Sequence, residues 1–406
     1  MSTVRPSHPP KALSRQAPDV VREYSTTATD PRALYARLRA ECPVALQEGT
    51  RGSSGGTKPA WLITRHADIM AACNDPDTFG QSVRFEGQRR PPLESNPPEH
   101  RTWRRLLQPF FTPKAIAQFA PVSREIASKL IGPLIDAGRG DFAAGVARPL
   151  PPQVLLALLR QPQEDWSAIK EASEAMYFQG SSQPEERARY EAADAFLWSY
   201  ARQAVEARKT TPQDPSADLI AAMLEGAKQG GEITEPLIAG VIRLFLGAGH
   251  DSTTSAVSIC AEYVAEDQAL QRKLREEPAL IPAAIEEILR LRPPVLQMPR
   301  TVMKDVTLHG RTLEEGDAAL LVYASGNLDE DAFPDATSFK LRSPNRHLSF
   351  GFGVHTCLGN SLARLEMRVT LEQLLSRTKS FRLSGAADHE FWHPFGSTAL
   401  PLVFEI

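Results

Sequence analysis

Cys357 stands in a run of residues whose types and spacing suit a metal-binding thiolate. The run from Phe350 to Gly359 reads FGFGVHTCLG, with glycines at 351, 353 and 359 that allow sharp turns. Backbone N–H groups that point at a sulfur stabilise the thiolate against protonation and tune a bound iron. A lone cysteine is more often a small core residue. The glycine-rich loop instead favours Cys357 as a thiolate ligand of haem iron.

The same ten residues fill every fixed position of the pattern Phe-Gly-x-Gly-x-His-x-Cys-x-Gly. In this they resemble the haem-binding loop of the bacterial soluble cytochrome P450 family. The resemblance implies that Cys357 is the axial ligand of haem b (iron protoporphyrin IX). It also implies that Phe350 packs beside the macrocycle, that Gly351 shapes the turn next to it, and that His355 donates a hydrogen bond to a propionate.

Two further motifs extend the resemblance over about residues 30 to 406. Glu287 and Arg290, in AAIEEILRLRPP, are three residues apart, so they share a helix face and can form an ion pair. In the family this pair joins a core helix to the segment before the haem loop, and Arg342 is the expected third member. The other motif is AGHDSTT at residues 248–254. Its small residues within an apolar stretch indicate either room for a ligand or a close helix crossing.

The segment 248–254 resembles the family's central helix over the distal face of the haem. The resemblance implies that Ala248 lines the cofactor site, that Asp251 gathers protons, and that the Ser252 hydroxyl donates a hydrogen bond on that face. The family more often has threonine where Ser252 stands, and serine lacks the methyl group that helps to fix the rotamer. Thr253 therefore remains a second candidate for this role. An ordinary helix-surface acid is the alternative interpretation of Asp251.

Three basic residues are candidates for binding the haem propionates. His100 and Arg104, in NPPEHRTWRRLL, are four residues apart on one face of a helix that begins after two prolines. They resemble the family pattern Asp-Pro-Pro-x-His-x-x-x-Arg, although Asn96 replaces its aspartate. Arg300 resembles the arginine that reaches the second propionate. Taken singly, each of the three is also consistent with a solvated surface charge.

Composition excludes several classes of protein. The chain has 406 residues, 42% of them hydrophobic, and a net charge of −3, which argues against nucleic-acid binding. Its four cysteines are scattered without paired spacing and predict reduced cytosolic thiols. Neither a signal peptide nor a membrane anchor is predicted, so we expect a cytoplasmic protein without a membrane partner. Residues 1–20 are expected to form a mobile tail, and residues 21–406 a single haem-thiolate monooxygenase domain.

The periodicity of apolar residues predicts a mostly α chain with small β-sheets. This agrees with the resembled P450 fold, a triangular helical prism with haem between the central and the cysteine-side helices. The sequence predicts a hairpin around a loose loop at residues 49–58. Helical patterns cover residues 113–135, 166–177, 185–209, 219–229, 235–265 and 280–292, and further strand patterns cover 306–308, 318–323 and 401–404.

The resemblance implies a monooxygenase that inserts one oxygen atom from O2 into a small lipophilic substrate, by hydroxylation or O-dealkylation. The predicted pocket residues are mainly apolar and favour a terpenoid or a substituted aromatic. They are Phe85, residues 176–178, Leu244, Gly247, Ala248, residues 295–297 and residues 393–395. A hydrogen-peroxide-driven peroxygenase, a natural-product tailoring oxidase and a haem sensor or electron carrier are the alternatives.

Electrons are expected from a separate protein. The candidate contact residues are basic and would lie on the thiolate side of the family fold: Arg105, Lys114, Arg364 and Arg368. They suit an acidic [2Fe–2S] ferredoxin, itself reduced by an NAD(P)H-dependent ferredoxin reductase. Scattered surface charge is the alternative interpretation of each of these residues.

Overall fold

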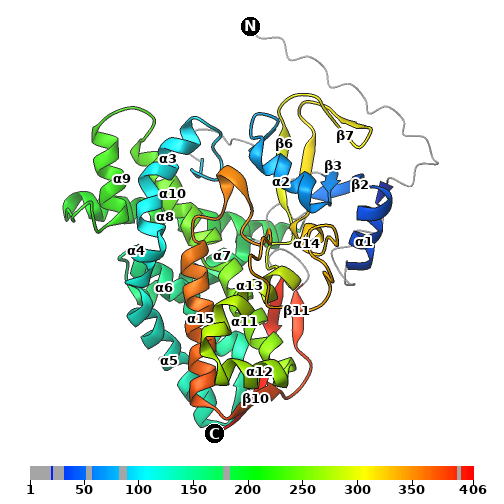
Figure 1. The fold of residues 1–406 in the computed structure, drawn as a ribbon. Coiled ribbons are helices and arrows are strands. Elements are labelled where there is room, and N and C mark those ends of the chain that lie inside the picture. The colour runs from blue at the N-terminus through cyan, green and yellow to red at the C-terminus, as the bar shows by residue number, and fades with distance from the viewer. Residues whose placement is uncertain (1–19, 22–31, 52–56, 82–88, 177–182, 391–394) are drawn as a thin grey trace.

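The computed structural model of the chain describes residues 20–21, 32–51, 57–81, 89–176, 183–390 and 395–406. Helices make up most of it and lie on one side, while the larger sheet lies on the other (Figure 1). The helices are α1 (Arg32–Glu41), α2 (His66–Asn74), α3 (Glu99–Leu107), α4 (Pro113–Ala117), α5 (Ala120–Asp136), α6 (Leu150–Leu158), α7 (Trp166–Ala175), α8 (Pro184–Thr210), α9 (Leu219–Lys228), α10 (Glu235–Ala248), α11 (Asp251–Glu266), α12 (Gln268–Glu276), α13 (Ile281–Leu291), α14 (Tyr323–Gly326) and α15 (Asn360–Arg377).

The strands form one sheet of six strands and several smaller ones. The larger sheet has the order β1-β2-β3-β9-β6-β4, and a three-stranded sheet has the order β10-β13-β5. Two pairs, β7-β8 and β11-β12, stand alone. The strands are β1 (Val20–Val21), β2 (Val44–Arg51), β3 (Thr57–Ile63), β4 (Phe79–Gly80), β5 (Arg139–Asp141), β6 (Met298–Val302), β7 (Val306–Leu308), β8 (Arg311–Leu313), β9 (Ala318–Leu321), β10 (Ser380–Leu383), β11 (Asp388–Glu390), β12 (Gly396–Ala399) and β13 (Pro401–Glu405).

The hydrophobic core centres on α11 and α15, which pack against each other and against α13. Helix α15 begins three residues after Cys357, so this packing connects the cysteine loop to the central helices. Most of the circumference of α15 is buried, including Leu362, Leu365, Val369 and Leu371, while Arg364, Arg368 and Glu372 lie on its partly exposed face. The buried Glu366 and Thr370 interrupt the apolar pattern of period 3.6, which is why the sequence patterns did not predict this helix.

The predicted fold class, mostly α with small sheets, is confirmed. The hairpin of β2 and β3 is also present, with Val44 paired to Ile63. Its strands extend into the expected loop, to Arg51 and from Thr57, and residues 52–56 lie outside the described part of the chain. The expected mobile tail, residues 1–20, also lies there apart from Val20, which pairs with β2.

The prediction of one continuous helix over residues 235–265 is wrong, because the helix is interrupted between α10 and α11. The Gly249 N–H still donates to the Phe245 carbonyl at 3.0 Å. His250 then leaves helical geometry, with φ −130° and ψ −32°. Its ring Nε2 lies 2.9 Å from the Leu246 carbonyl oxygen. The His250 side chain is therefore the hydrogen-bond partner of this carbonyl at the helix break. Helix α11 starts again at Asp251, and the interruption sets the position of that side chain.

No helix in the described residues is long and apolar enough to span a lipid bilayer.

Candidate active site

The backbone of the cysteine loop is held in a tight turn. The Cys357 N–H donates to the Phe350 carbonyl at 2.8 Å. Gly351 and Gly353 have φ values of 67° and 69°, a region that glycine occupies at little cost. A Cβ atom at Gly353 would also lie 2.3 Å from the Cys73 carbonyl oxygen, so this position requires glycine. Gly359 has φ −81°, a value open to any residue, so the backbone turn there does not depend on glycine.

Cys357 differs from the other three cysteines in its exposure. Cys357 is exposed, whereas Cys42, Cys73 and Cys260 are buried. Burial of the loop raises the pKa of the Cys357 thiol. Backbone N–H groups from Gly359 and Asn360, at the start of α15, lower that pKa, as do the nearby guanidinium groups of Arg104 and Arg364. These N–H groups are the donors expected beside a thiolate ligand.

Four basic side chains from three parts of the chain gather beside this loop. The His100 ring on α3 lies 4.2 Å from the His355 ring, measured between centroids. Arg104 Nη1 donates to the Thr356 carbonyl at 2.9 Å, and Arg300 on β6 is buried. Burial together with Arg104 lowers the pKa of His100 to about 4. Burial, His100 and Arg300 lower the pKa of His355 to about 3.

This basic cluster fits the two propionates of haem. His100 Nδ1 and His355 Nε2 are buried, and no residue in the described part of the chain is hydrogen-bonded to either atom. Buried donors without partners are costly, and every charge that perturbs these two rings is positive. A bound carboxylate would relieve both penalties. Phe350, whose ring has Arg364 stacked 4.2 Å from its centroid, lies on the same loop.

The replacement at Asn96 has a local explanation. Its side-chain Oδ1 accepts from the Gln81 N–H at 2.8 Å, and its Nδ2 donates to the Gln81 carbonyl at 3.1 Å. An amide can make both bonds, whereas an ionised carboxylate can only accept. Asn96 therefore ties the entry to α3 to the segment after β4 and leaves His100 and Arg104 in place.

Asp251 is a buried, ion-paired carboxylate at the first position of α11. Its Oδ1 lies 2.5 Å from Lys170 Nζ and 3.2 Å from His250 Nδ1. Its Oδ2 accepts a hydrogen bond from Ser173. Burial alone would raise the pKa of Asp251, but His250 and Lys170 outweigh burial and hold this pKa well below its usual range. The alternative interpretation of Asp251 as an ordinary surface acid is therefore wrong.

Lys170 and Ser173 were not predicted from the sequence. Both lie on α7, about eighty residues before Asp251, and they have no motif of their own. A cation and a hydroxyl on one face of a helix are typical of many solvated surfaces. Only the packing of α7 on α11 turns them toward Asp251.

Ser252 and Thr253 differ in their surroundings. The Ser252 hydroxyl points back at the Ala248 carbonyl oxygen, 3.4 Å away, across the helix break. Ala248 itself is exposed although both helices beside it are largely buried. Thr253 is buried. Ser252 and Ala248 therefore face an accessible side, and Thr253 packs into the protein.

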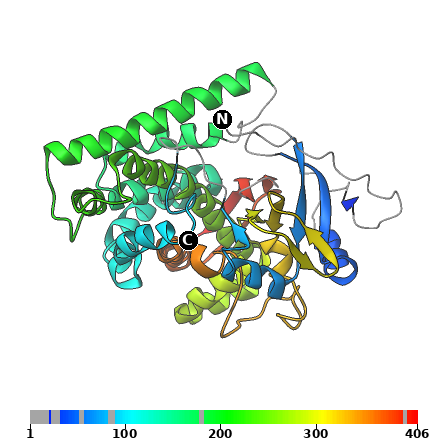
Figure 2. The same ribbon diagram turned by 90° about the horizontal axis from the view of Figure 1, so that it is seen from above.

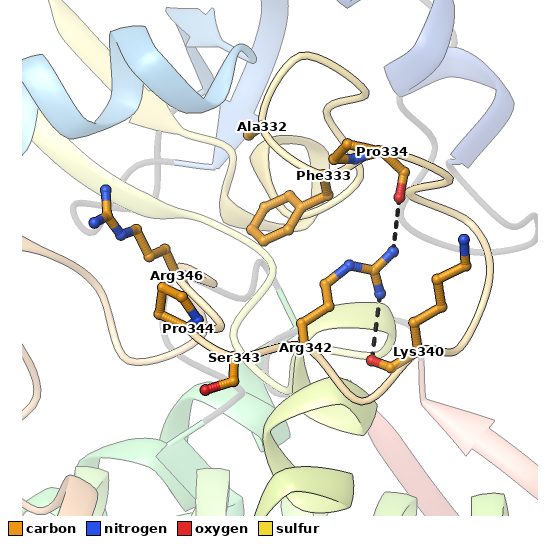
Figure 3. Close-up of a pocket in the computed structure, with 8 residues that line it drawn as sticks. All are labelled: Ala332, Phe333, Pro334, Lys340, Arg342, Ser343, Pro344 and Arg346. Carbon is orange, nitrogen blue, oxygen red and sulfur yellow. Dashed lines mark hydrogen bonds between the residues drawn. The ribbon is translucent and has the colours of Figure 1, made fainter.

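The Glu287–Arg290 pair lies away from these groups and ties α13 to the segment before the cysteine loop. Both residues are fully buried, with Arg290 Nη2 2.8 Å from Glu287 Oε1. Arg342 also contacts Glu287, as expected of the third member. Figure 3 shows Arg342 in a surface pocket of about 490 Å³, where it donates to the Pro334 and Lys340 carbonyls. The lining of this pocket contains none of the residues discussed above as cofactor or proton-delivery groups.

Cys357 presents an exposed thiol beside backbone N–H groups. Two buried ring nitrogens without a hydrogen-bond partner in the described residues, on His100 and His355, lie next to its loop. This arrangement is expected of a haem-thiolate protein. The family model for cytochrome P450 matches residues 183–384. Mycinamicin IV hydroxylase/epoxidase of Micromonospora griseorubida is 35% identical over 336 residues, which are 80% of this chain and 83% of that protein. Cytochrome P450-SU2 of Streptomyces griseolus is 32% identical over 357 residues, covering 84% and 85%.

The crystal structure of CYP108D1 from Novosphingobium aromaticivorans has the same fold, with a TM-score of 0.79 and 30% identity over 91% of this chain and 93% of that one. The chain belongs to the cytochrome P450 family. It is a monooxygenase, and its cofactor is haem b.

Proposed function

We propose that the enzyme hydroxylates or O-dealkylates a small lipophilic substrate, a terpenoid or a substituted aromatic. Haem b, when bound, supplies the activation of O2, and the Cys357 thiolate favours cleavage of the O–O bond. His100, Arg104, Arg300 and His355 would hold its propionates. The observation that carries the proposal is the Asp251–Ser252 pair, a buried carboxylate next to an accessible hydroxyl.

The two residues divide the handling of protons. Asp251 is held as a carboxylate by Lys170 and Ser173, so it can accept a proton from solvent only when these contacts loosen. Ser252 holds a proton at Oγ on the accessible side of the helix break. A peroxide-driven peroxygenase needs no such supply of protons, so the pair favours the O2-dependent reaction. A natural-product tailoring oxidase remains the second candidate, because one relative is a mycinamicin IV hydroxylase/epoxidase.

Asp251→Asn is expected to slow turnover by about 10²-fold, the usual scale for loss of a positioned acid–base group. Haem content and the spin shift induced by a substrate should not change. Ser252→Ala is expected to keep NADH consumption but to divert it to hydrogen peroxide. Thr253→Ala should have little effect, because Thr253 is buried. The measurement is product formed per NADH consumed, in all three variants with one substrate that shifts the spin state.

Thr253→Ala serves as the matched control for Ser252→Ala, since the two hydroxyls are adjacent in the chain. Uncoupling by Thr253→Ala without uncoupling by Ser252→Ala would show that the wrong hydroxyl has been assigned. Full turnover by Asp251→Asn would remove Asp251 from proton delivery.

Electrons are proposed to come from a [2Fe–2S] ferredoxin and its NAD(P)H-dependent reductase. Arg105 on α3 and Lys114 on α4 are exposed, and these helices adjoin the cysteine loop and α15. They support an acidic partner at this surface. Arg364 is engaged in a two-pronged ion pair with Glu286, at 2.7 and 2.8 Å, so it contributes less than expected from the sequence. Arg368 is half-buried and lies 3.8 Å from Glu372.

Turnover driven by NADH is expected to be negligible with the enzyme alone and to be restored by adding ferredoxin and ferredoxin reductase. Arg105→Glu and Lys114→Glu should each raise the ferredoxin concentration needed for half-maximal reduction, more strongly at low salt. Efficient turnover without partner proteins would refute a separate electron donor. If both variants need the same ferredoxin concentration as the wild type, the ferredoxin binds at another surface.

The cytoplasm is the proposed location, supported by four cysteines that are all free thiols. The predicted pocket segments near Phe85, at residues 177–178 and at 393–394 lie outside the described residues. Leu244 on α10 is buried, and Gly247 is partly exposed next to Ala248.

A further inference from the structure

Arg243 on α10 is a buried cation that none of the roles above uses. It is 2% exposed and lies one helical turn before Gly247. Its Nε and Nη2 both donate to a single oxygen, Asp194 Oδ1 on α8, at 3.2 and 2.7 Å. Nη2 also contacts Met176 Sδ at 3.3 Å. For Nη1 the described residues provide no acceptor.

Arg290 shows how a purely structural buried arginine is satisfied in this chain. Its Nε and Nη2 bond the carboxylate of Glu287, and its Nη1 donates to the carbonyls of Asn327 and Ala336 at 2.7 and 2.6 Å. Each nitrogen of Arg290 thus has an acceptor. Arg243 differs, because one nitrogen with two N–H groups remains. Because Nη1 is not enclosed by protein, an acceptor group from outside the chain can reach it.

The position of Nη1 directs it along α10 toward the accessible part of the helix. A Cβ atom placed on Gly247 would lie 3.2 Å from Arg243 Nη1, so the missing side chain leaves that nitrogen uncovered. The next residue is Ala248, which is exposed. A group bound at Nη1 would therefore lie beside the residues that lead to Ser252.

A second cation lies close to Arg243. The backbone at Arg89 packs directly against Gly240 on α10. A Cβ atom at Gly240 would lie 2.0 Å from the Arg89 carbonyl oxygen. Arg90 follows directly, and its charge lowers the pKa of Arg243, together with burial. Arg90 is itself 2.6 Å from Glu94. The two guanidinium groups repel each other, and an anion bound near both would relieve the repulsion.

We propose that Arg243 is a specificity-determining residue that binds a carboxylate on the substrate, with Arg90 adding to the attraction. This rests on the proposed function and narrows its substrate class to lipophilic carboxylic acids. The carboxylate end would lie at Nη1, and the apolar remainder would extend past Gly247 and Ala248. The Asp194 carboxylate, partly exposed at 27%, balances the charge of Arg243 when no substrate is bound.

The competing explanation is that Arg243 and Asp194 only tie α8 to α10. The two helices pack along each other, and Figure 2 shows α8 as the long green helix at the edge of the molecule. The two explanations differ in the expected effect of Asp194→Asn. The amide still accepts from Arg243 but no longer carries a competing negative charge. If Arg243 binds substrate, the variant should bind carboxylates more tightly than the wild type. If the Arg243–Asp194 pair only joins the two helices, the variant should be less stable and should bind carboxylates no more tightly.

The test uses the haem-loaded enzyme and two lipophilic acids, 4-methoxybenzoate and decanoate, each compared with its primary amide. Dissociation constants are measured by the spin-state shift and, independently, by titration calorimetry. At least one carboxylate is expected to bind about tenfold or more tightly than its amide, because hydrogen bonds to charged groups are stronger. Arg243→Met should bring this ratio close to one, and Asp194→Asn should raise it about threefold.

Arg208→Met is the matched control, since Arg208 also pairs with an aspartate, Asp218 at 3.0 Å. It is fourteen residues from Asp194 on α8, about 21 Å along the helix, and should keep the wild-type ratio. Equal binding of acids and amides by the wild type, or an unchanged ratio in Arg243→Met, would overturn the proposal. If Arg243→Met fails to load haem, an unchanged ratio in Asp194→Asn would overturn it. A wild-type enzyme whose haem shows no thiolate ligation would instead count against the proposed function.

Discussion

Arg290→Met is expected to lower the free energy of unfolding by about 3–5 kcal/mol, the range for removing one partner of a buried ion pair. Glu287 would remain fully buried with its charge, and Arg342, at the edge of the site, would be its only guanidinium partner among the described residues. Three carbonyls that Arg290 binds, those of Asn327, Ala336 and Ser338, would also lose a donor. The measurement is urea unfolding of the purified protein.

Loss of the pair should also affect the cofactor. The carbonyls of Ala336 and Ser338 belong to the segment that leads to the cysteine loop, so the variant is expected to retain less haem at equal protein concentration. Arg124→Met is the control, because Arg124 and Glu372 form an exposed pair at 2.7 Å. Such pairs contribute about 0–1 kcal/mol. If the two variants lose equal stability, the Glu287–Arg290 pair does not hold this segment.

Local motifs in the sequence predicted the groups near the cysteine. The loop around Cys357, the spacing of His100 and Arg104, and the pair Glu287–Arg290 each lie within ten residues, so their geometry follows from a turn or a helix. Arg300 and Arg342 came from the resemblance to the family. The structure places Arg300 beside His355 and Arg342 on Glu287.

Groups that depend on packing between distant helices could not be predicted. Lys170 reaches Asp251 because α7 packs on α11, and Arg243 reaches Asp194 because α8 packs on α10. The break at His250 was also missed, since the stretch keeps its apolar pattern on both sides of it. In each case the residue types are ordinary for a helix, and only the tertiary contact gives them a role.

Cys357→Ala and Cys357→His are expected to abolish monooxygenase activity. Alanine provides no axial ligand. Histidine can coordinate iron but supplies a neutral nitrogen in place of the electron-donating thiolate that favours O–O cleavage. The donors from Gly359 and Asn360 would then have no sulfur to stabilise. Cys260→Ala is the control, because Cys260 is a buried thiol on α11 whose sulfur contacts Met367, and it should keep full activity.

The most direct test of Cys357 as the axial ligand is the absorption spectrum of the reduced carbon-monoxide complex. The wild type and Cys260→Ala are expected to show the signature of thiolate-ligated haem, and both Cys357 variants are expected to lack it. Persistence of the thiolate signature in Cys357→Ala or Cys357→His would contradict the assignment of this cysteine as the ligand of the haem iron.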